Sequence, residues 1–172
     1  PASAFQCSTL PPGCTISYGL MLWVYFRRNH AFYFSRNVLM LSSFIGLVGY
    51  NLLPTAPPRM FPELGFEDTL NQTAINHQSG IVAMFANPYA AMPSLHTAYA
   101  LTIGITAITV TRNPLVRLAW ALYPALVVFS IVSTANHWLL DAVAGAGVAC
   151  CAFLIAFAIA RGVLPRRDRD PV

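Results

Sequence analysis

Long apolar segments without a charged residue dominate this chain and restrict what it can fold into. Of its 172 residues, 56% are hydrophobic and only 9% are charged, whereas a water-soluble domain carries about 25% charged residues. So few charges cannot cover a soluble surface, and the sequence is not of low complexity. These properties exclude disorder, collagen and a small disulfide-stapled secreted fold. We therefore predict an all-α integral membrane protein with a single domain over residues 1–172.

Four apolar stretches are long enough to serve as membrane spans. They are residues 37–53, 95–111, about 115–135 and 138–160. The first has about 17 residues, or about 26 Å as a helix, which is at the short end of what crosses a bilayer. A fifth apolar stretch, residues 15–26, is too short to cross alone. We interpret it as the end of a helix whose beginning is missing, which gives four to five visible spans.

The basic residues orient these spans. All ten are arginines, and nine of them fall in three places that the positive-inside rule assigns to the cytoplasmic side. These places lie before the first span, between the second and third, and after the fourth, and they contain Arg27, Arg28, Arg36, Arg112, Arg117, Arg161, Arg166, Arg167 and Arg169. The net charge of +4 therefore reflects membrane topology and does not indicate binding to nucleic acid.

The opposite, outer side receives the proline-rich segment 54–93 and the turn around Asn136. A connection as long as the first is usually functional, and we expect a short helix within it at about residues 71–85. Arg59, the tenth arginine, lies in this segment. An arginine-only, alanine-rich composition is typical of bacterial GC-rich genomes, so we expect a bacterial plasma membrane protein whose outer side faces the periplasm.

Two pairs of polar residues lie at the outer ends of the predicted spans, where ionisable groups are costly unless they serve a function. His137 and Asp141 are four residues apart, so on a helix they share one face. The carboxylate could accept one imidazole proton and leave the other nitrogen as a nucleophile or base. Ser94 follows a proline and precedes an apolar helix, the expected place of an N-cap. The free amides and positive dipole end of that helix would form a phosphate cradle beside His96.

Arg59 stands apart from the other arginines, on the side that is poor in basic residues. Its guanidinium can hold two phosphate oxygens at once. An anion clamp, an oriented histidine and a second histidine as general acid are what phosphoryl transfer needs, since its catalysis rests on positioning and charge stabilisation.

Three short motifs resemble those of the type 2 phosphatidic acid phosphatase superfamily. Residues 93–96 (Pro-Ser-Leu-His) resemble its Pro-Ser-x-His motif, and residues 137–141 (His-Trp-Leu-Leu-Asp) resemble its His-x-x-x-Asp motif. Residues 57–59 (Pro-Pro-Arg) resemble the altered first motif of the branch related to inositol phosphorylceramide synthases. The order of the motifs and their shared outer side make the combination specific, and the resemblance covers about residues 36–161.

The resemblance implies a helical bundle, usually of six spans, and a reaction without metal or cofactor. His137 would attack phosphorus and become a phosphohistidine, with Asp141 orienting it. His96 would protonate the leaving alcohol and later activate the acceptor. Arg59 and Ser94 would bind the phosphate oxygens.

Three positions depart from the family pattern of the phosphatases, and two of them lose a positive charge. Leu52 stands where their first motif has a lysine, and Ile131 stands where their third motif has an arginine. Met60, not proline, follows Arg59. The loss of two positive charges makes the chain resemble the inositol phosphorylceramide synthase branch more than a typical lipid phosphatase, and it bears on whether activity is retained.

We expect a membrane enzyme that transfers a phosphoryl group from phosphorylated lipids, with water as the acceptor in a lipid phosphatase. Alternatively, an alcohol such as inositol accepts the group in a headgroup phosphotransferase. A non-catalytic lipid-binding protein is a further alternative. His96, His137 and Asp141 would also be a legitimate ligand set for a divalent metal, although the positive charge of Arg59 opposes a bound cation.

Several neighbouring residues receive structural interpretations. Asn136 is expected to end the preceding helix rather than to touch substrate, and Trp138 to belong to an interfacial aromatic belt. Gly145 and Gly147 are expected to allow close packing between helices.

Overall fold

Five α-helices and two short 3₁₀ helices make up the described part of this computed structural model, which comprises residues 12–65 and 89–163. They follow one another as α1 (Pro12–Arg27), α2 (Asn29–Leu52), η1 (Pro58–Met60), η2 (Pro62–Leu64), α4 (Leu95–Val110), α5 (Pro114–Ser133) and α6 (Leu139–Val163). Within these residues the one β-type pairing is an isolated bridge between Thr55 and Ala90. The all-α prediction is confirmed.

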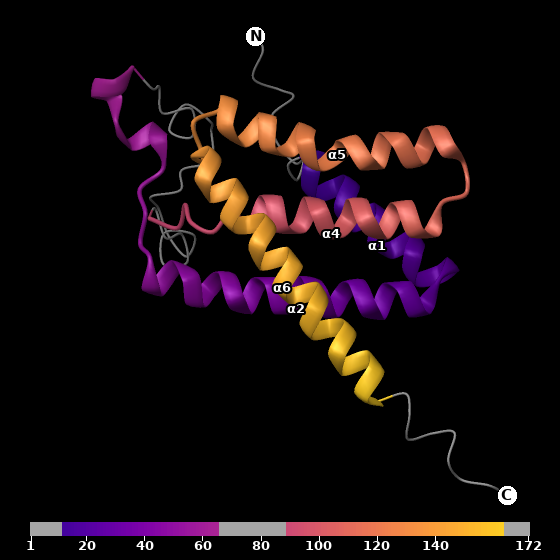
Figure 1. Cartoon of the computed structure of the whole chain (residues 1–172). Coiled ribbons are helices and arrows are strands. Elements are labelled where there is room, and N and C mark those ends of the chain that lie inside the picture. The colour runs from indigo at the N-terminus through magenta and orange to yellow at the C-terminus, as the bar shows by residue number, and fades with distance from the viewer. Residues whose placement is uncertain (1–11, 66–88, 164–172) are drawn as a thin grey trace, which may run out of the picture.

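Helix α4 is the centre of the bundle and contacts each of the other four described α-helices. Figure 1 shows α2, α4 and α5 running side by side, with α6 crossing them obliquely. Half of the sixteen residues of α4 are buried, and most of these are small: Thr97, Ala98, Ala100, Thr102, Ile103, Gly104, Thr106 and Ala107. Small side chains let neighbouring helix backbones approach closely, as is typical of helix packing in membranes.

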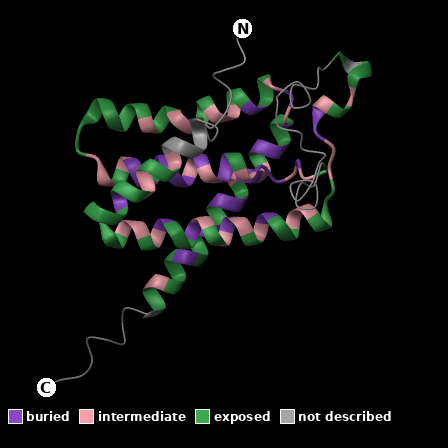
Figure 2. Cartoon of the chain, turned by 180° about the vertical axis from the view of Figure 1, so that it is seen from behind, coloured by how far each residue is buried: buried purple, intermediate pink, exposed green. Residues whose placement is uncertain are grey.

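The surface of the bundle is apolar along its helices. Large side chains such as Leu118, Leu126 and Phe129 on α5 and Leu154 on α6 are exposed, and Figure 2 shows exposed residues along the outer faces of these helices. Helices α2, α5 and α6 are long and apolar enough to cross a membrane. The chain is therefore a polytopic helical membrane protein.

One of the predicted segment boundaries was wrong. The first span begins at Asn29, not at residue 37, and the expected loop before it is a single break at Arg28. Arg36 lies inside α2, where its guanidinium is placed over the ring of Tyr33, 5.0 Å from the ring centroid. A long side chain of this kind can keep its charge at the surface while its helix continues. The predicted second span is the 16-residue α4, shorter than the other three.

The two ends of the bundle differ in what they collect. One end holds the break between α1 and α2 and the connection between α4 and α5, which carry Arg28 and Arg112. The other holds η1, η2 and the first turns of α4 and α6 (Figure 1). All three motifs thus meet at one end, as the arginine pattern predicts. The short helix expected at residues 71–85 lies outside the described residues.

Candidate functional site

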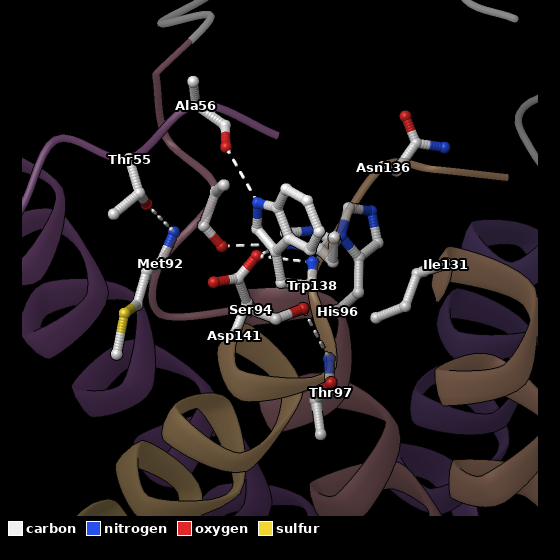
Figure 3. A network of polar contacts seen from close by, with 12 residues as sticks. Thr55, Ala56, Met92, Ser94, His96, Thr97, Ile131, Asn136, Trp138 and Asp141 are labelled. Carbon is white, nitrogen blue, oxygen red and sulfur yellow. Dashed lines mark hydrogen bonds and ion pairs between the residues drawn. The ribbon is translucent and has the colours of Figure 1, made fainter. Parts of the chain in front are cut away.

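The site begins with two extended segments that run beside each other, one after α2 and one before α4. The Thr55 amide donates to the carbonyl of Tyr89 at 2.9 Å, and the Ala91 amide donates to the carbonyl of Thr55 at 3.3 Å. The side chain of Thr55 also accepts a hydrogen bond of 2.8 Å from the Met92 amide (Figure 3). These bonds hold the carbonyl of Ala91 in place over the first turns of α4 and α6.

His137 is buried in the bend between α5 and α6, and both of its ring nitrogens have partners. Its Nδ1 lies 2.9 Å from the carbonyl oxygen of Ala91 and 3.5 Å from Oδ2 of Asp141. A carbonyl oxygen can only accept, so Nδ1 of His137 carries the proton and the neutral ring has its lone pair on Nε2. The tautomer that leaves a nucleophile is thus set by the hydrogen-bond network.

His96, in the first turn of α4, faces that lone pair. Its Nδ1 lies 3.3 Å from Nε2 of His137, and the two rings meet edge to face with their centroids 5.5 Å apart. Because Nε2 of His137 is the acceptor, Nδ1 of His96 is the donor. The structure therefore brings together the two predicted catalytic histidines, His96 exposed and His137 buried.

Asp141 is 2% exposed and has two partners. Besides its contact with His137, Oδ2 accepts a hydrogen bond of 2.8 Å from the backbone amide of Trp138 (Figure 3). This bond closes the first turn of α6 as an acidic side chain does in a capping box. The premise that His137 and Asp141 share a helix face was wrong, because α6 begins at Leu139. The two side chains meet across the turn that leads into the helix.

Ser94 is the N-cap of α4, as predicted, and its hydroxyl accepts from the Thr97 amide at 3.5 Å. Its own amide donates to the carbonyl of Asp141 at 3.0 Å, which joins the first turns of α4 and α6. A Cβ atom on Gly145 would lie 2.1 Å from the carbonyl oxygen of Ser94, so only glycine allows this approach. The packing role predicted for Gly145 is confirmed. That predicted for Gly147 was wrong, since nothing lies within 4 Å of a Cβ there.

Arg59 reaches the site from η1. Its Nη1 donates to Oδ1 of Asn136 at 2.7 Å, and its amide donates to the carbonyl of Ala135 at 3.0 Å. Ala135 has a φ of 53°, a left-handed conformation that turns the chain sharply between α5 and His137. The interpretation of Asn136 as a helix end was wrong: α5 ends at Ser133, and Asn136 holds the arginine.

Trp138 has a contact that its sequence position does not reveal. Its indole N–H donates to the carbonyl of Ala56 at 3.1 Å (Figure 3). The side chain thereby ties the segment that carries Arg59 to the start of α6. From sequence, an interfacial position explains a tryptophan at this place equally well.

Burial lowers the pKa of His137 below its ordinary value. The carboxylate of Asp141 and the Ala91 carbonyl act in the opposite direction, while the positive charge of Arg59 adds to the lowering. The net direction keeps the imidazole neutral at neutral pH, the state in which Nε2 can attack an electrophile.

Positions 52 and 131, which lack the positive charge of the phosphatase motifs, differ in their surroundings. Leu52 ends α2 and is 73% exposed, whereas Ile131 is 8% exposed. The carbonyl of Ile131 accepts from the amides of Asn136 and His137, at 3.0 and 3.1 Å. Ile131 thus supports the turn through its backbone while its side chain packs in the interior.

Among residues 12–65 and 89–163, no three His, Cys, Asp or Glu side chains are grouped to hold a metal ion.

A histidine pair, a buried carboxylate and an arginine thus meet at one end of a membrane helical bundle. Residues 8–155 match the family model described as the PAP2 superfamily, and the chain belongs to that superfamily. A phosphoinositol dihydroceramide synthase of Bacteroides thetaiotaomicron is 27% identical over an alignment of 153 residues, which covers 81% of this chain and 50% of that protein. The chain thus spans about half the length of this relative. No solved structure matches the chain significantly.

The family is one of membrane lipid phosphatases and phosphotransferases, and the predicted membership in it is confirmed. The relative also agrees with the resemblance of residues 57–59 to the inositol phosphorylceramide synthase branch.

Proposed function

We propose that this protein transfers a phosphoryl group from a membrane lipid through a phosphohistidine on His137. The observation that carries the proposal is the assignment of the lone pair of His137 to Nε2, opposite Nδ1 of His96. A protonated Nδ1 cannot attack, and the second nitrogen is left as the nucleophile.

Substrate binding has to separate the two histidines. A distance of 3.3 Å between their nitrogens leaves no room for a phosphoryl group, so the lipid phosphate replaces this hydrogen bond with contacts of its own. His137 Nε2 then attacks phosphorus, and the bond from phosphorus to the lipid oxygen breaks. His96, doubly protonated at this stage, gives its Nδ1 proton to the leaving oxygen as general acid.

The second step reverses these roles. Neutral His96 takes a proton from the acceptor, whose oxygen attacks phosphorus while the bond to Nε2 of His137 breaks. With water as the acceptor the product is inorganic phosphate, and with an alcohol it is a new phosphate ester. Asp141 and the Ala91 carbonyl hold the same nitrogen of His137 in both steps.

Arg59 and the first turn of α4 are the proposed phosphate clamp. Asn136 fixes the guanidinium of Arg59, and the amide of His96 lies outside the helical hydrogen-bond ladder. Ser94 is fully buried, so its proposed part is to cap and position this amide end. No step in this scheme uses a cofactor or a metal. We assign the site to the outer, periplasmic side because the opposite end carries the arginines.

A headgroup phosphotransferase is the second candidate. The relative named phosphoinositol dihydroceramide synthase supports it, as do the uncharged residues at positions 52 and 131. In this case an alcohol such as inositol or a lipid alcohol takes the place of water.

Phosphate release from a panel of lipid phosphates, measured in detergent with an excess of chelator, tests the proposal. Release by the wild type that His137→Ala abolishes supports a phosphatase with this nucleophile. Headgroup exchange without phosphate release supports the transferase. Full activity of His137→Ala in both assays would overturn the phosphohistidine, and activity that depends on a metal would overturn the metal-free scheme.

A further inference from the structure

An apolar groove runs along the bundle from the candidate site towards the middle of the membrane. Its volume is about 630 Å³, within the range of sites that bind small molecules. Helix α5 packs against α4 and barely contacts α6, which leaves the groove between α5 and α6 with α4 as its floor. Apart from Thr97 and Ser133, all of the lining side chains are apolar.

The groove matches one leaflet of a bilayer in depth. On α5 its lining extends from Ser133, at the outer end, inward to Pro124, which is about 14 Å of helix. On α6 it extends from Leu139 to Ala146, or about 10 Å. Half of the hydrocarbon core is about 15 Å thick. The exposed side chains of Phe129 and Val143 on its walls show that it opens to the surroundings of the bundle.

The outer end of the groove lies next to the candidate site. Thr97 lines the groove and directly follows His96 in α4. On the α6 side, the groove is lined by Leu139 and Ala142, which lie on either side of Asp141 in the sequence. A lipid whose phosphate lies between His96 and His137 would therefore have its acyl region next to this opening.

Thr97 supplies a second, independent observation. Its side chain is 3% exposed, and its hydroxyl has no hydrogen-bond partner. The other threonines of α4 bond to carbonyls of the preceding turn, Thr102 to Ala98, Thr106 to Thr102 and Thr109 to Thr106. A buried hydroxyl without a partner is costly, and Thr97 is part of the groove lining. A lipid in the groove would bring its ester or amide linkage to this level, one residue after His96.

We infer that this groove holds an acyl chain of the lipid substrate, with Thr97 as a hydrogen-bonding partner for the polar linkage at the head of that chain. The inference rests on the proposed function for the identity of the lipid. The groove then selects lipids by chain length, because its inner end at Pro124, Ala125 and Ala146 limits how many methylenes it can cover.

Filling the inner end tests this inference. Ala125→Phe places an aromatic ring in the groove, and Ala121→Phe, one turn earlier on α5, places the same ring on an exposed position outside it. The value of kcat/KM is measured with dipalmitoyl and with dioctanoyl phosphatidic acid at equal mole fraction in mixed micelles, or with the same two chain lengths of phosphatidylinositol if transfer is the activity.

We expect Ala125→Phe to lower kcat/KM for the dipalmitoyl lipid about tenfold or more, the loss expected when several methylenes are expelled from an apolar site. The dioctanoyl lipid should be converted as before, and Ala121→Phe should change neither. An equal loss of kcat/KM on both lipids, or no loss on either, would overturn the inference that the groove holds an acyl chain.

Thr97→Val removes the hydroxyl at constant shape and should lower kcat/KM for both lipids about three- to tenfold. Thr97→Ser should restore it. A valine variant with wild-type kinetics would overturn the role of the hydroxyl.

Thermal stabilisation by each lipid reports binding without turnover. Dipalmitoyl phosphatidic acid should raise Tm more than the dioctanoyl lipid, and Ala125→Phe should abolish the difference. A wild type that binds in this way but neither hydrolyses nor transfers would overturn the proposed function and support the groove. A shift that is independent of chain length in the wild type would overturn the groove whatever the activity.

Discussion

The Nδ1 atom of His137 lies 2.9 Å from the carbonyl oxygen of Ala91, nearer than the 3.5 Å that separates it from Asp141. In a catalytic triad the acidic residue alone holds the histidine in its tautomer, and its replacement by an amide costs about 10⁴ in kcat. Here a backbone carbonyl, which no substitution removes, shares that work.

Asp141→Asn should therefore retain substantial activity. The amide oxygen of asparagine can still accept from the Trp138 amide, and Ala91 still accepts the proton of His137. We expect kcat to fall about 10- to 100-fold, as for the loss of an orienting partner. A loss near 10⁴ in a steady-state assay would show that Asp141 alone sets the tautomer. Asp141→Ala is the control for capping: it should lower Tm in addition, by removing the acceptor that begins α6.

The pH dependence of kcat/KM should report the pKa of the buried His137. Activity needs its neutral form, so the acid limb of the profile reports its pKa in the free enzyme. Burial lowers this pKa, and we expect the limb below the ordinary histidine value of about 6.5. The carboxylate of Asp141 raises the same pKa. Its removal in Asp141→Asn should therefore move the limb to still lower pH.

Both profiles are to be measured on the same lipid, so that the ionisation of the substrate phosphate cancels in the comparison. A limb that moves to higher pH in Asp141→Asn would contradict the assignment of His137 as the group that must be neutral.

Much of this site can be predicted from the sequence, because its motifs consist of side chains that are recognised by residue type. The cap at Ser94 follows from its place before an apolar helix, and the arginines place the motifs on one side. His137 and Asp141 are close in sequence and meet as predicted, but across the turn before α6 and not on one helix face. The Ala91 carbonyl could not be predicted, since a backbone acceptor leaves no mark on residue type. The start of the first span is predicted too late because a charged residue, Arg36, ends the uncharged stretch. The long side chain of an arginine can reach the surface from within a helix, so its charge does not end the span.

Gly145 and Gly147 show the same limit at a finer scale. Both stand in a run of small residues and are indistinguishable by composition. Two residues along a helix are about 200° around its axis, so they face opposite ways. Only the packing of α4 decides which glycine is needed.

Gly145→Ala should destabilise the protein and Gly147→Ala should not. The added Cβ at position 145 meets the backbone of Ser94 at 2.1 Å, and a carbonyl cannot move aside as a flexible side chain can. We expect a loss of about 1–3 kcal/mol, the usual cost of overpacking, measured as a lower Tm in detergent. Position 147 is open, so alanine there should leave Tm unchanged or raise it, given its higher helix propensity. Equal effects at the two positions would contradict the close approach of α4 and α6.

Substitutions of Asn136 test whether Arg59 needs to be held in position, because they leave the charge of the arginine itself unchanged. Asn136→Ala removes the acceptor 2.7 Å from Nη1, so the guanidinium becomes less ordered. We expect kcat/KM to fall about three- to tenfold, the range for loss of one hydrogen bond, with weaker inhibition by inorganic phosphate. Asn51→Ala, which alters an exposed asparagine bonded to its own helix at Leu47, is the control and should have no effect.

Asn136→Asp makes the test decisive, because it keeps the acceptor and adds a negative charge. If Asn136 only supports the turn after α5, aspartate should be at least as active as alanine, because both lose the hydrogen bond from Nδ2 to Thr134 and aspartate alone keeps the acceptor. If Arg59 serves as an anion clamp, the new carboxylate competes with the lipid phosphate for the guanidinium and repels it. Asn136→Asp should then be less active than Asn136→Ala and less sensitive to phosphate inhibition. The reverse order of the two variants would remove Arg59 from the phosphate site and leave it the structural partner of Asn136.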